Sequence, residues 1–311
     1  MKEPPEWLKS YLLNRYKSSS YANFLQMQIL ELHEGEITVS MLVRHELTNL
    51  SRILHGGAVD SLLDMAMNLV CFSMGWRAIN LGFNTNFLSG AREGQTVRAV
   101  AKVLHSGRST MVVEGRVLDE QDKLLAKGRG TFVVTGRFTP EDLEGEAPSP
   151  PIRQEAPRGN PRAVTPEAKS LTGWLRDLLL HVHERNYFAK YLGMEIDEIG
   201  EHNCVVSMFV THSHINIRGV VHGGALVALA DMSMMLACAT LGKHTVTLDL
   251  NISFIRRVSE GDIIKAYPLV IHKGKTTMVV RAGILDGAGR LLAEARGTFF
   301  VTGDYTPDEW E

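Results

Sequence analysis

The stretch NLSRILHGGAVDSLLD, residues 49–64, decides the fold, because it returns as NIRGVVHGGALVALAD at residues 216–231. Each copy holds an Asn, a His–Gly–Gly–Ala run and an Asp at the same spacing. The offset of 167 positions holds without a gap over the first copy from Trp7 to Pro140. A repeat of domain length predicts a tandem duplication of one domain, and not a solenoid of short repeats.

The composition is that of a globular protein and suits two domains. The chain has 311 residues, of which 44% are hydrophobic and 22% charged, and its net charge is −2. This balance gives no reason to expect nucleic acid or membrane as a partner. The N-terminus lacks the apolar core of a signal peptide, and no apolar run is long enough to span a bilayer. The three cysteines form no CxxC pair, so we expect a cytoplasmic protein with thiols packed in its core.

A proline-rich segment separates the two copies. Residues 141–170 hold six of the eleven prolines and few large apolar residues, which is typical of an extended linker. We therefore expect a first domain at residues 1–140, a linker at 141–170 and a second domain at 171–311.

Each copy predicts the same order of elements. The apolar stretch Ala58–Met74 contains no Pro or Gly, and its length favours a helix over a strand. An amphipathic helix and two strands precede it, and four strands follow it. One long apolar helix with one antiparallel sheet implies a sheet that wraps the helix, an α+β fold. The expected elements of the first copy are a helix over Trp7–Tyr16, a strand pair including Ile37–Val43, and strands near 79–89, 95–105, 109–119 and 123–135.

Gly56 and Gly57 precede the first long helix, as Gly223 and Gly224 precede the second. The first amides of a helix lack intrahelical acceptors and carry the positive end of its dipole. Glycine lets another atom approach that backbone closely. Together these features predict an oxyanion hole for a carbonyl oxygen. A plain turn at the start of a helix is the alternative.

Asp64 and Asp231 lie nine residues after the histidine, about two and a half turns into the helix. Asp231 is the only charge within ALVALADMSMMLACATL. An ionised carboxylate on such a helix is costly unless it is paired or used. It could act as a nucleophile or as a general base. An Asp bonded to a neighbouring loop is the structural alternative.

The Asn–x5–His–Gly–Gly–Ala–x5–Asp motif resembles that of the hotdog-fold thioesterases, specifically the phenylacetyl-CoA thioesterase-like branch. The resemblance covers both copies and leaves out only the linker. It implies two hotdog domains, each an antiparallel sheet wrapped around a long central helix. It also implies hydrolysis of aryl- or fatty-acyl-CoA to free acid and CoA, with the helix Asp as nucleophile or general base.

The resemblance assigns further roles. The asparagines of the motif would orient the His or the thioester, with an ordinary turn as the alternative. The histidines would position the loop and the thioester rather than abstract a proton. The family's strand carries a hydroxyl that holds the attacking water. Thr247 fits this role, and its counterpart in the first copy departs from the pattern. The residues concerned are Asn49, Asn216, His55, His222, Thr247 and Asn80.

Paired hotdog domains of this family build each site from both partners, and we expect the same within this chain. The His–Gly loop of one domain would face the acid of the other. One site would combine His55 and Gly56 with Asp231 and Thr247, and the other His222 and Gly223 with Asp64 and Asn80. The surroundings of Asp231 are closer to the family pattern.

Basic side chains near the strand turns are candidates for the CoA phosphates, since guanidinium and ammonium groups suit phosphate. Ordinary solvated surface charges are the alternative. The second glycines of the motif are further candidates for substrate binding. We expect no metal and no cofactor apart from CoA as part of the substrate. The candidate binding residues are Arg108, Lys273, Lys275, Arg256, Arg257, Gly57 and Gly224.

Three functions compete. The first is an acyl-CoA thioesterase, the second a non-catalytic acyl-CoA-binding or sensor module, and the third a hotdog hydratase or dehydratase. The helix acid in both copies favours the first, and the hydratase loop with its Asn-Pro is absent. Acyl preference and the choice between CoA and acyl carrier protein stay open. The resemblance also predicts a homodimer of double-hotdog chains.

Overall fold

The computed structural model describes residues 2–143, 167–169, 171 and 173–307. Most of the predicted linker, 144–166 and 170, lies outside the described residues. Of the linker's described ends, residues 140–143 form the short helix η2 (Pro140–Leu143) and residues 167–169 form β7 (Glu167–Lys169). The expected boundaries of the two domains therefore remain predictions.

Both copies contain the predicted elements in the predicted order, with short helices added between them. The first copy contains α1 (Glu6–Lys17), α2 (Ser20–Phe24), β1 (Gln28–His33), β2 (Glu36–Leu42), η1 (His45–Leu47), α3 (Gly56–Ser73), β3 (Trp76–Phe87), β4 (Thr96–Ser106), β5 (Thr110–Leu118) and β6 (Leu124–Arg137). The second contains α4 (Gly173–Glu184), α5 (Tyr187–Tyr191), β8 (Met194–Gly200), β9 (Asn203–Phe209), η3 (His212–His214), α6 (Gly223–Ala239), β10 (Lys243–Phe254), β11 (Ile263–Lys273), β12 (Thr277–Asp286) and β13 (Leu291–Asp304).

Two short helices, α2 and α5, were not predicted. Each has five residues and begins at a polar cap, Ser19 or Asn186, whose side chain accepts a backbone N–H. Five residues are too few to show helical periodicity in a sequence. Capping signals alone would have located them.

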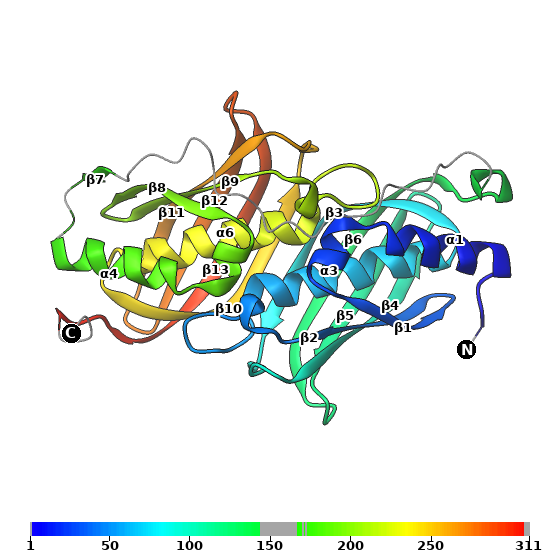
Figure 1. Ribbon diagram of the computed structural model, residues 1–311, viewed down its shortest axis with the longest axis horizontal. Helices are drawn as coiled ribbons and strands as arrows, with labels where there is room; N and C mark the ends of the chain where they lie inside the picture. The colour runs from blue at the N-terminus through cyan, green and yellow to red at the C-terminus, as the bar shows by residue number, and fades with distance from the viewer. Residues whose placement is uncertain (1, 144–166, 170, 172, 308–311) are drawn as a thin grey trace.

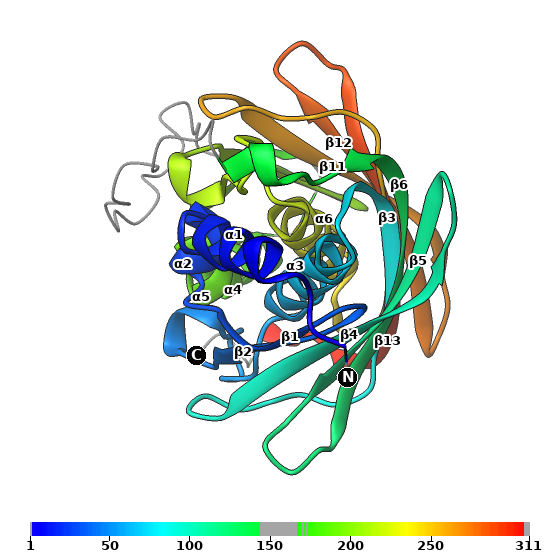
Figure 2. The ribbon, with the colours of Figure 1, turned by 90° about the vertical axis from the view of Figure 1, so that its right-hand side faces the viewer.

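The sheets of the two copies join into one. In the described part of the chain they form a single 13-stranded sheet, in which β3 pairs antiparallel with β10. Figure 2 shows this sheet curving around the central helices, so that α3 and α6 lie on its concave side. Figure 1 shows the two copies side by side, with the strands of each crossing behind its own helix. The predicted wrapping of a sheet around each helix is confirmed.

Gly82 allows β3 and β10 to pair closely where the sheets of the two copies join. It lies opposite Ser253 in the pairing of β3 with β10. A Cβ atom at Gly82 would lie 2.2 Å from the carbonyl oxygen of Ile252, which is far inside van der Waals contact. The backbones of the two strands therefore approach each other at a distance that only glycine allows.

We predict that Gly82→Ala weakens the joined sheet. Overpacking of a well-packed site costs about 1–3 kcal/mol, and here the clash is with backbone, which cannot rotate away. Chemical denaturation of the purified variant measures the loss in free energy of unfolding. Gly303→Ala in β13 is the matched control, because nothing lies within 4 Å of its added Cβ. Equal stability of the two variants would contradict the close approach of β3 and β10 at Gly82.

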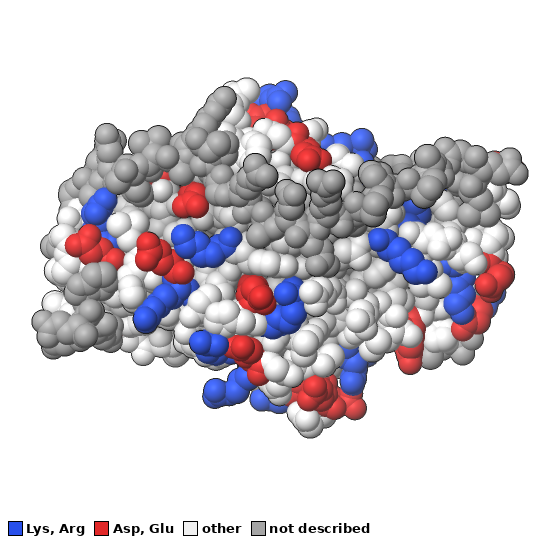
Figure 3. All heavy atoms as spheres, viewed as in Figure 1, with Lys and Arg blue, Asp and Glu red and all other residues white. Residues whose placement is uncertain are grey.

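The core and the surface agree with the composition. Cys71, Cys204 and Cys238 are buried and free, as predicted. The face drawn in Figure 3 carries lysines and arginines interspersed with acids, without a broad field of one sign. None of the described helices has the length and apolarity needed to cross a membrane.

Candidate active site

The first composite cluster joins the start of α3 to the middle of α6. The Thr247 hydroxyl on β10 donates to Asp231 Oδ1 at 2.9 Å. On the other side of the carboxylate, Asp231 Oδ2 lies 3.9 Å from His55 Nδ1. Asp231 and His55 are both buried. We call this cluster the Asp231 site, and it contains the four residues expected together: His55, Gly56, Asp231 and Thr247.

The second cluster, the Asp64 site, joins the start of α6 to the middle of α3. Asp64 Oδ1 accepts hydrogen bonds from two side-chain amide groups, that of Asn80 at 2.7 Å and that of Asn68 at 2.8 Å. Asp64 Oδ2 lies 3.2 Å from His222 Nδ1. Asn68 was missed by the sequence analysis. Its position one helical turn after Asp64 was the available signal, because residues four apart share a helix face.

The first glycine of each motif brings the carboxylate of the other domain against a helix N-terminus. A Cβ at Gly56 would lie 3.1 Å from Asp231 Oδ2, and one at Gly223 would lie 2.7 Å from Asp64 Oδ2. Aromatic rings of Phe87 and Phe254 close the same spaces. Within the described residues, neither the Gly56 nor the Gly223 N–H has a hydrogen-bond acceptor. Each site thus pairs an unused N–H with a carboxylate.

The histidines cap the helices and are neutral. His55 Nδ1 accepts the N–H of Gly57 at 3.0 Å, and His222 Nδ1 accepts that of Gly224 at 3.0 Å. Burial lowers the pKa of both imidazoles, and the facing aspartates offset part of that fall. A ring nitrogen that accepts an amide proton carries none of its own, so the proton sits on Nε2. The contacts between His and Asp are therefore not ion pairs.

The two carboxylates differ in their surroundings. Burial raises the pKa of Asp231, and His55 and the Thr247 hydroxyl offset part of the rise. A raised pKa brings a carboxylate closer to the range that suits a general base. The Thr247 hydroxyl oxygen can still accept a hydrogen bond from water while it donates to Asp231. In the Asp64 site, the Asn80 carbonyl oxygen is already occupied by the N–H of Gly82 at 2.9 Å.

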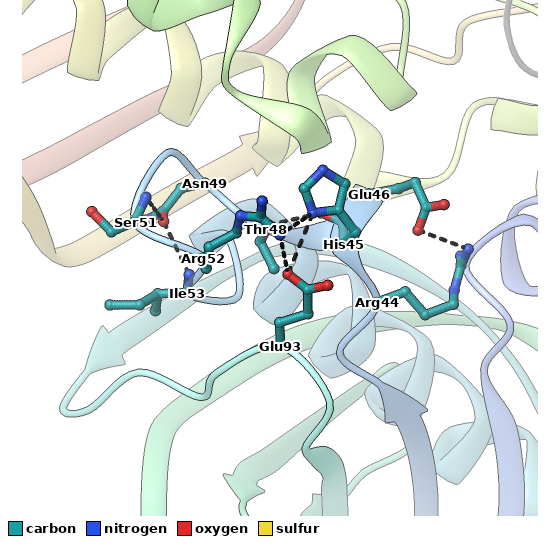
Figure 4. Close-up of polar contacts among 9 residues, drawn as sticks. All are labelled: Arg44, His45, Glu46, Thr48, Asn49, Ser51, Arg52, Ile53 and Glu93. Carbon is teal, nitrogen blue, oxygen red and sulfur yellow. Dashed lines mark hydrogen bonds and ion pairs between the residues drawn. The ribbon is translucent and has the colours of Figure 1, made fainter.

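The asparagines of the motif shape their own loops. Asn49 Oδ1 accepts the backbone N–H of Ser51 at 2.9 Å and of Ile53 at 3.2 Å, as Figure 4 shows. Asn216 Oδ1 likewise accepts the N–H of Arg218 at 2.8 Å. This is the turn-forming alternative of the sequence analysis. Asn216 also lines the cavity described below, whereas the bonds of Asn49 all lie within its loop.

The second glycines lie where the two central helices pack closely, and their expected role in substrate binding stays a prediction. A Cβ at Gly57 would lie 2.5 Å from Ala228 Cβ, and one at Gly224 would lie 2.5 Å from Ser61 Cα. These atoms belong to the facing central helix. Gly57 and Gly224 are buried because they let α3 and α6 cross closely, and this crossing sets the distance between the two sites.

A cavity of about 370 Å³ opens beside the Asp64 site. Apolar side chains of α3, including Met65, Leu69 and Phe72, form one wall. Two of the predicted binding residues, Arg256 and Arg257, line it, and so does Arg218, which the sequence analysis missed. The other three predicted basic residues are exposed on hairpin turns and do not line this cavity: Arg108, Lys273 and Lys275.

A third buried carboxyl lies between the two sites. Asp60, one turn before Asp64 on α3, is fully buried, and neither of its oxygens has a hydrogen-bond partner in the described part of the chain. Burial raises its pKa well above the ordinary value; the nearby Thr85 hydroxyl offsets part of the rise, and the charges of Asp231 and Asp64 add to it. Asp60 is therefore protonated over a range where an exposed Asp is ionised.

We predict that Asp60 makes the stability of the chain fall as pH rises. The unfolded chain releases this proton near pH 3.8, whereas the folded chain retains it to higher pH. Between those two pKa values the unfolding free energy drops by about 1.4 kcal/mol per pH unit. Asp60→Asn removes this slope. Denaturation of both proteins across pH measures the difference, and parallel curves would contradict it.

Comparison with known proteins places the chain in a family. The model of the thioesterase superfamily matches residues 52–126 and 218–293, one segment in each copy. A putative esterase of Archaeoglobus fulgidus is 33% identical over 128 residues, 41% of this chain and 83% of that protein. Acyl-coenzyme A thioesterase PaaI of Escherichia coli is 34% identical over 116 residues, 37% of this chain and 83% of that protein.

A solved structure matches both copies together. The tesB protein of Mycobacterium avium subs. paratuberculosis covers 91% of this chain and 100% of its own, with a TM-score of 0.61 at 15% identity, a likeness of fold alone. The wrapped sheet with its two central helices, together with these relatives, makes the chain a thioester hydrolase with two hotdog copies. The chain belongs to the thioesterase superfamily, as the motif predicted.

Proposed function

We propose that the chain hydrolyses acyl-CoA thioesters to free acid and CoA at two composite sites. The observation that carries the proposal is the carboxylate of one domain lying beside the first glycine of the other domain's central helix, whose N–H has no acceptor among the described residues. The similarity to acyl-coenzyme A thioesterase PaaI supports CoA as the carrier. The apolar wall of the cavity supports an aryl or fatty acyl group, and its lining arginines support the anionic CoA.

The proposed reaction uses the N–H of Gly56 or Gly223 to stabilise the charge on the thioester oxygen. One such donor contributes roughly 10²- to 10³-fold to the rate. As general base, the Asp takes a proton from water while the water oxygen bonds to the carbonyl carbon. The C–S bond then breaks, and the CoA thiolate takes the proton. As nucleophile, the Asp oxygen instead bonds to the carbonyl carbon, the C–S bond breaks, and CoA leaves as its thiolate. Water then cleaves the resulting acyl anhydride to the free acid and the Asp carboxylate, and the proton released goes to the thiolate.

Oxygen labelling separates the two roles of the Asp. In a single turnover in H₂¹⁸O, a nucleophilic Asp64 or Asp231 retains label in its carboxylate when water attacks the protein carbonyl of the anhydride. A general base acquires none, and the label appears only in the released acid. Mass spectrometry of the peptides that carry the two aspartates reads the outcome.

The activity is tested by release of free CoA from a panel of aryl- and fatty-acyl-CoAs. A thiol-reactive dye reports the product. The proposal predicts turnover, and the panel identifies the preferred acyl group. Tight binding of an acyl-CoA without any CoA release would instead indicate the non-catalytic binding module.

We infer that two chains associate through the outer face of the sheet. Val246 of β10 and Phe300 of β13 are register partners, and each is exposed, 51% and 41%. Leu269 and Ile271 of β11 are also exposed. Exposed apolar side chains grouped on one face mark interaction surfaces. The cytoplasmic location of the protein stays a prediction, which the three free cysteines support.

Sedimentation tests the association. We expect a dimer of the 34.5 kDa chain, and we expect Phe300→Glu to shift it toward monomer. A wild-type protein that sediments only as a 34.5 kDa monomer at micromolar concentration would contradict the dimer.

A further inference from the structure

Four arginines from four separate segments meet next to the Asp64 site. A second hollow, of about 320 Å³, shares Phe72, Arg218 and Arg257 with the cavity of that site. Its lining includes arginines from α1, β3, the loop before α6 and the segment after β10. We call these side chains the arginine cluster: Arg15, Arg77, Arg218 and Arg257.

Hydrogen bonds to backbone carbonyl oxygens hold two side chains of the cluster in place. Arg15 donates to the carbonyl oxygen of Ile217 at 2.8 Å, and Arg218 donates to that of Ala78. The guanidinium carbon of Arg218 also lies 5.2 Å from the centre of the Phe72 ring. Fixed guanidinium groups lose little freedom when an oxyanion binds, and their planar fork fits carboxylate and phosphate.

The cluster concentrates positive charge. Partial burial and the charges of Arg257, Arg77 and Arg15 lower the pKa of Arg218. Among the described residues, no carboxylate forms an ion pair with Arg218 or Arg257. Like charges held together at a cavity wall favour a bound anion, which removes their mutual repulsion.

The cluster exists at only one of the two sites. The 167-residue offset pairs the four arginines with neutral or small residues at the Asp231 site. Arg218 corresponds to Ser51, and the full set of counterparts is Val182, His244, Ser51 and Gly90. The Asp231 site therefore cannot make the same contact, although it has its own acid and helix N–H.

We infer that the Asp64 site binds an anionic group of its thioester substrate in the arginine cluster, and that the two sites of the chain consequently differ in substrate affinity. This inference rests on the proposed function for the nature of the substrate. The group is an oxyanion, carried as a phosphate of CoA or as a carboxylate on the acyl chain. The same guanidinium chemistry suits both.

Binding measurements on a catalytically silent chain test the inference separately from activity. The chain with Asp64→Asn and Asp231→Asn is titrated calorimetrically with hexyl-CoA thioether, which cannot be hydrolysed. A second probe, the ω-carboxyhexyl thioether of N-acetylcysteamine, carries the carboxylate but no phosphate. We expect two unequal affinities for at least one probe, and the probe that shows them identifies the source of the oxyanion.

Substitution then locates the tighter site. In the silent chain, Arg218→Ser and Arg257→Ser are expected to weaken the tighter affinity about 10- to 100-fold each, because a hydrogen bond to a charged group contributes that much. The weaker affinity stays unchanged. Arg108→Ser, on an exposed turn away from the cluster, is the matched control.

The outcomes are distinct. Two unequal affinities that collapse to one in the arginine variants support the inference, even if the wild type releases no CoA and the proposed function fails. Equal affinities for both probes, or unequal affinities that survive Arg218→Ser and Arg257→Ser, overturn it, even if the wild type is an active thioesterase.

Discussion

Replacing both Asp64 and Asp231 by asparagine is expected to lower kcat/KM for acyl-CoA hydrolysis by roughly 10²- to 10⁴-fold, the contribution of a positioned acid–base group. Asparagine keeps the shape of the side chain but can neither take a proton from water nor attack a thioester. Each single variant keeps one intact site, since the two carboxylates lie in different clusters.

Asp60→Asn is the matched control for this loss. Asp60 is equally buried on the same helix but lies outside both clusters, so its substitution should leave kcat/KM within a few-fold of the wild type. Circular dichroism of every variant separates loss of chemistry from loss of fold. A double variant with wild-type activity would remove the aspartates from the mechanism.

Adding a methyl group at Gly223 should disable the Asp64 site. The new Cβ would lie 2.7 Å from Asp64 Oδ2 and 2.9 Å from the Phe254 ring, so the carboxylate must move away from its position beside the helix start. With Asp231→Asn silencing the other site, we expect Gly223→Ala to lower kcat/KM roughly 10²- to 10⁴-fold, the contribution of the positioned acid–base group that the new Cβ displaces.

The matching change at Gly56 should be milder. Its added Cβ would lie 3.1 Å from Asp231 Oδ2, a distance that a small shift can relieve. Gly56→Ala in the Asp64→Asn background should therefore lose less activity than Gly223→Ala in the Asp231→Asn background. The reverse order would show that the close approach of carboxylate and glycine does not control the rate.

The motif predicted much of the site, because spacing along a helix fixes which residues share a face. His55, Gly56 and Asp64 follow from that spacing alone. That His55 and Gly56 belong to one site and Asp64 to the other could be predicted only from the pairing of the two domains, which the family resemblance implied. The two glycines of each motif look alike in sequence, yet only the crossing of α3 and α6 assigns Gly57 to packing.

Other features depend on contacts between residues far apart in the chain. Nothing in the local sequence of Arg218 indicates that its loop reaches the cavity beside Asp64, 154 positions earlier. The joining of two sheets into one also escaped prediction, since edge pairing between β3 and β10 leaves no periodic signal. Gly82 was visible in the sequence, but the carbonyl oxygen that requires it belongs to the other domain.

The central claim, that each site is built from both domains, is tested most directly by pairing two substitutions in one chain. Asp64→Asn with Gly223→Val damages one site twice and should leave the Asp231 site active. Asp64→Asn with Gly56→Val damages one residue of each site and should leave the chain inactive in the CoA-release assay. The opposite pattern, with activity only when both changes lie in the same domain, would show that each domain holds its own complete site.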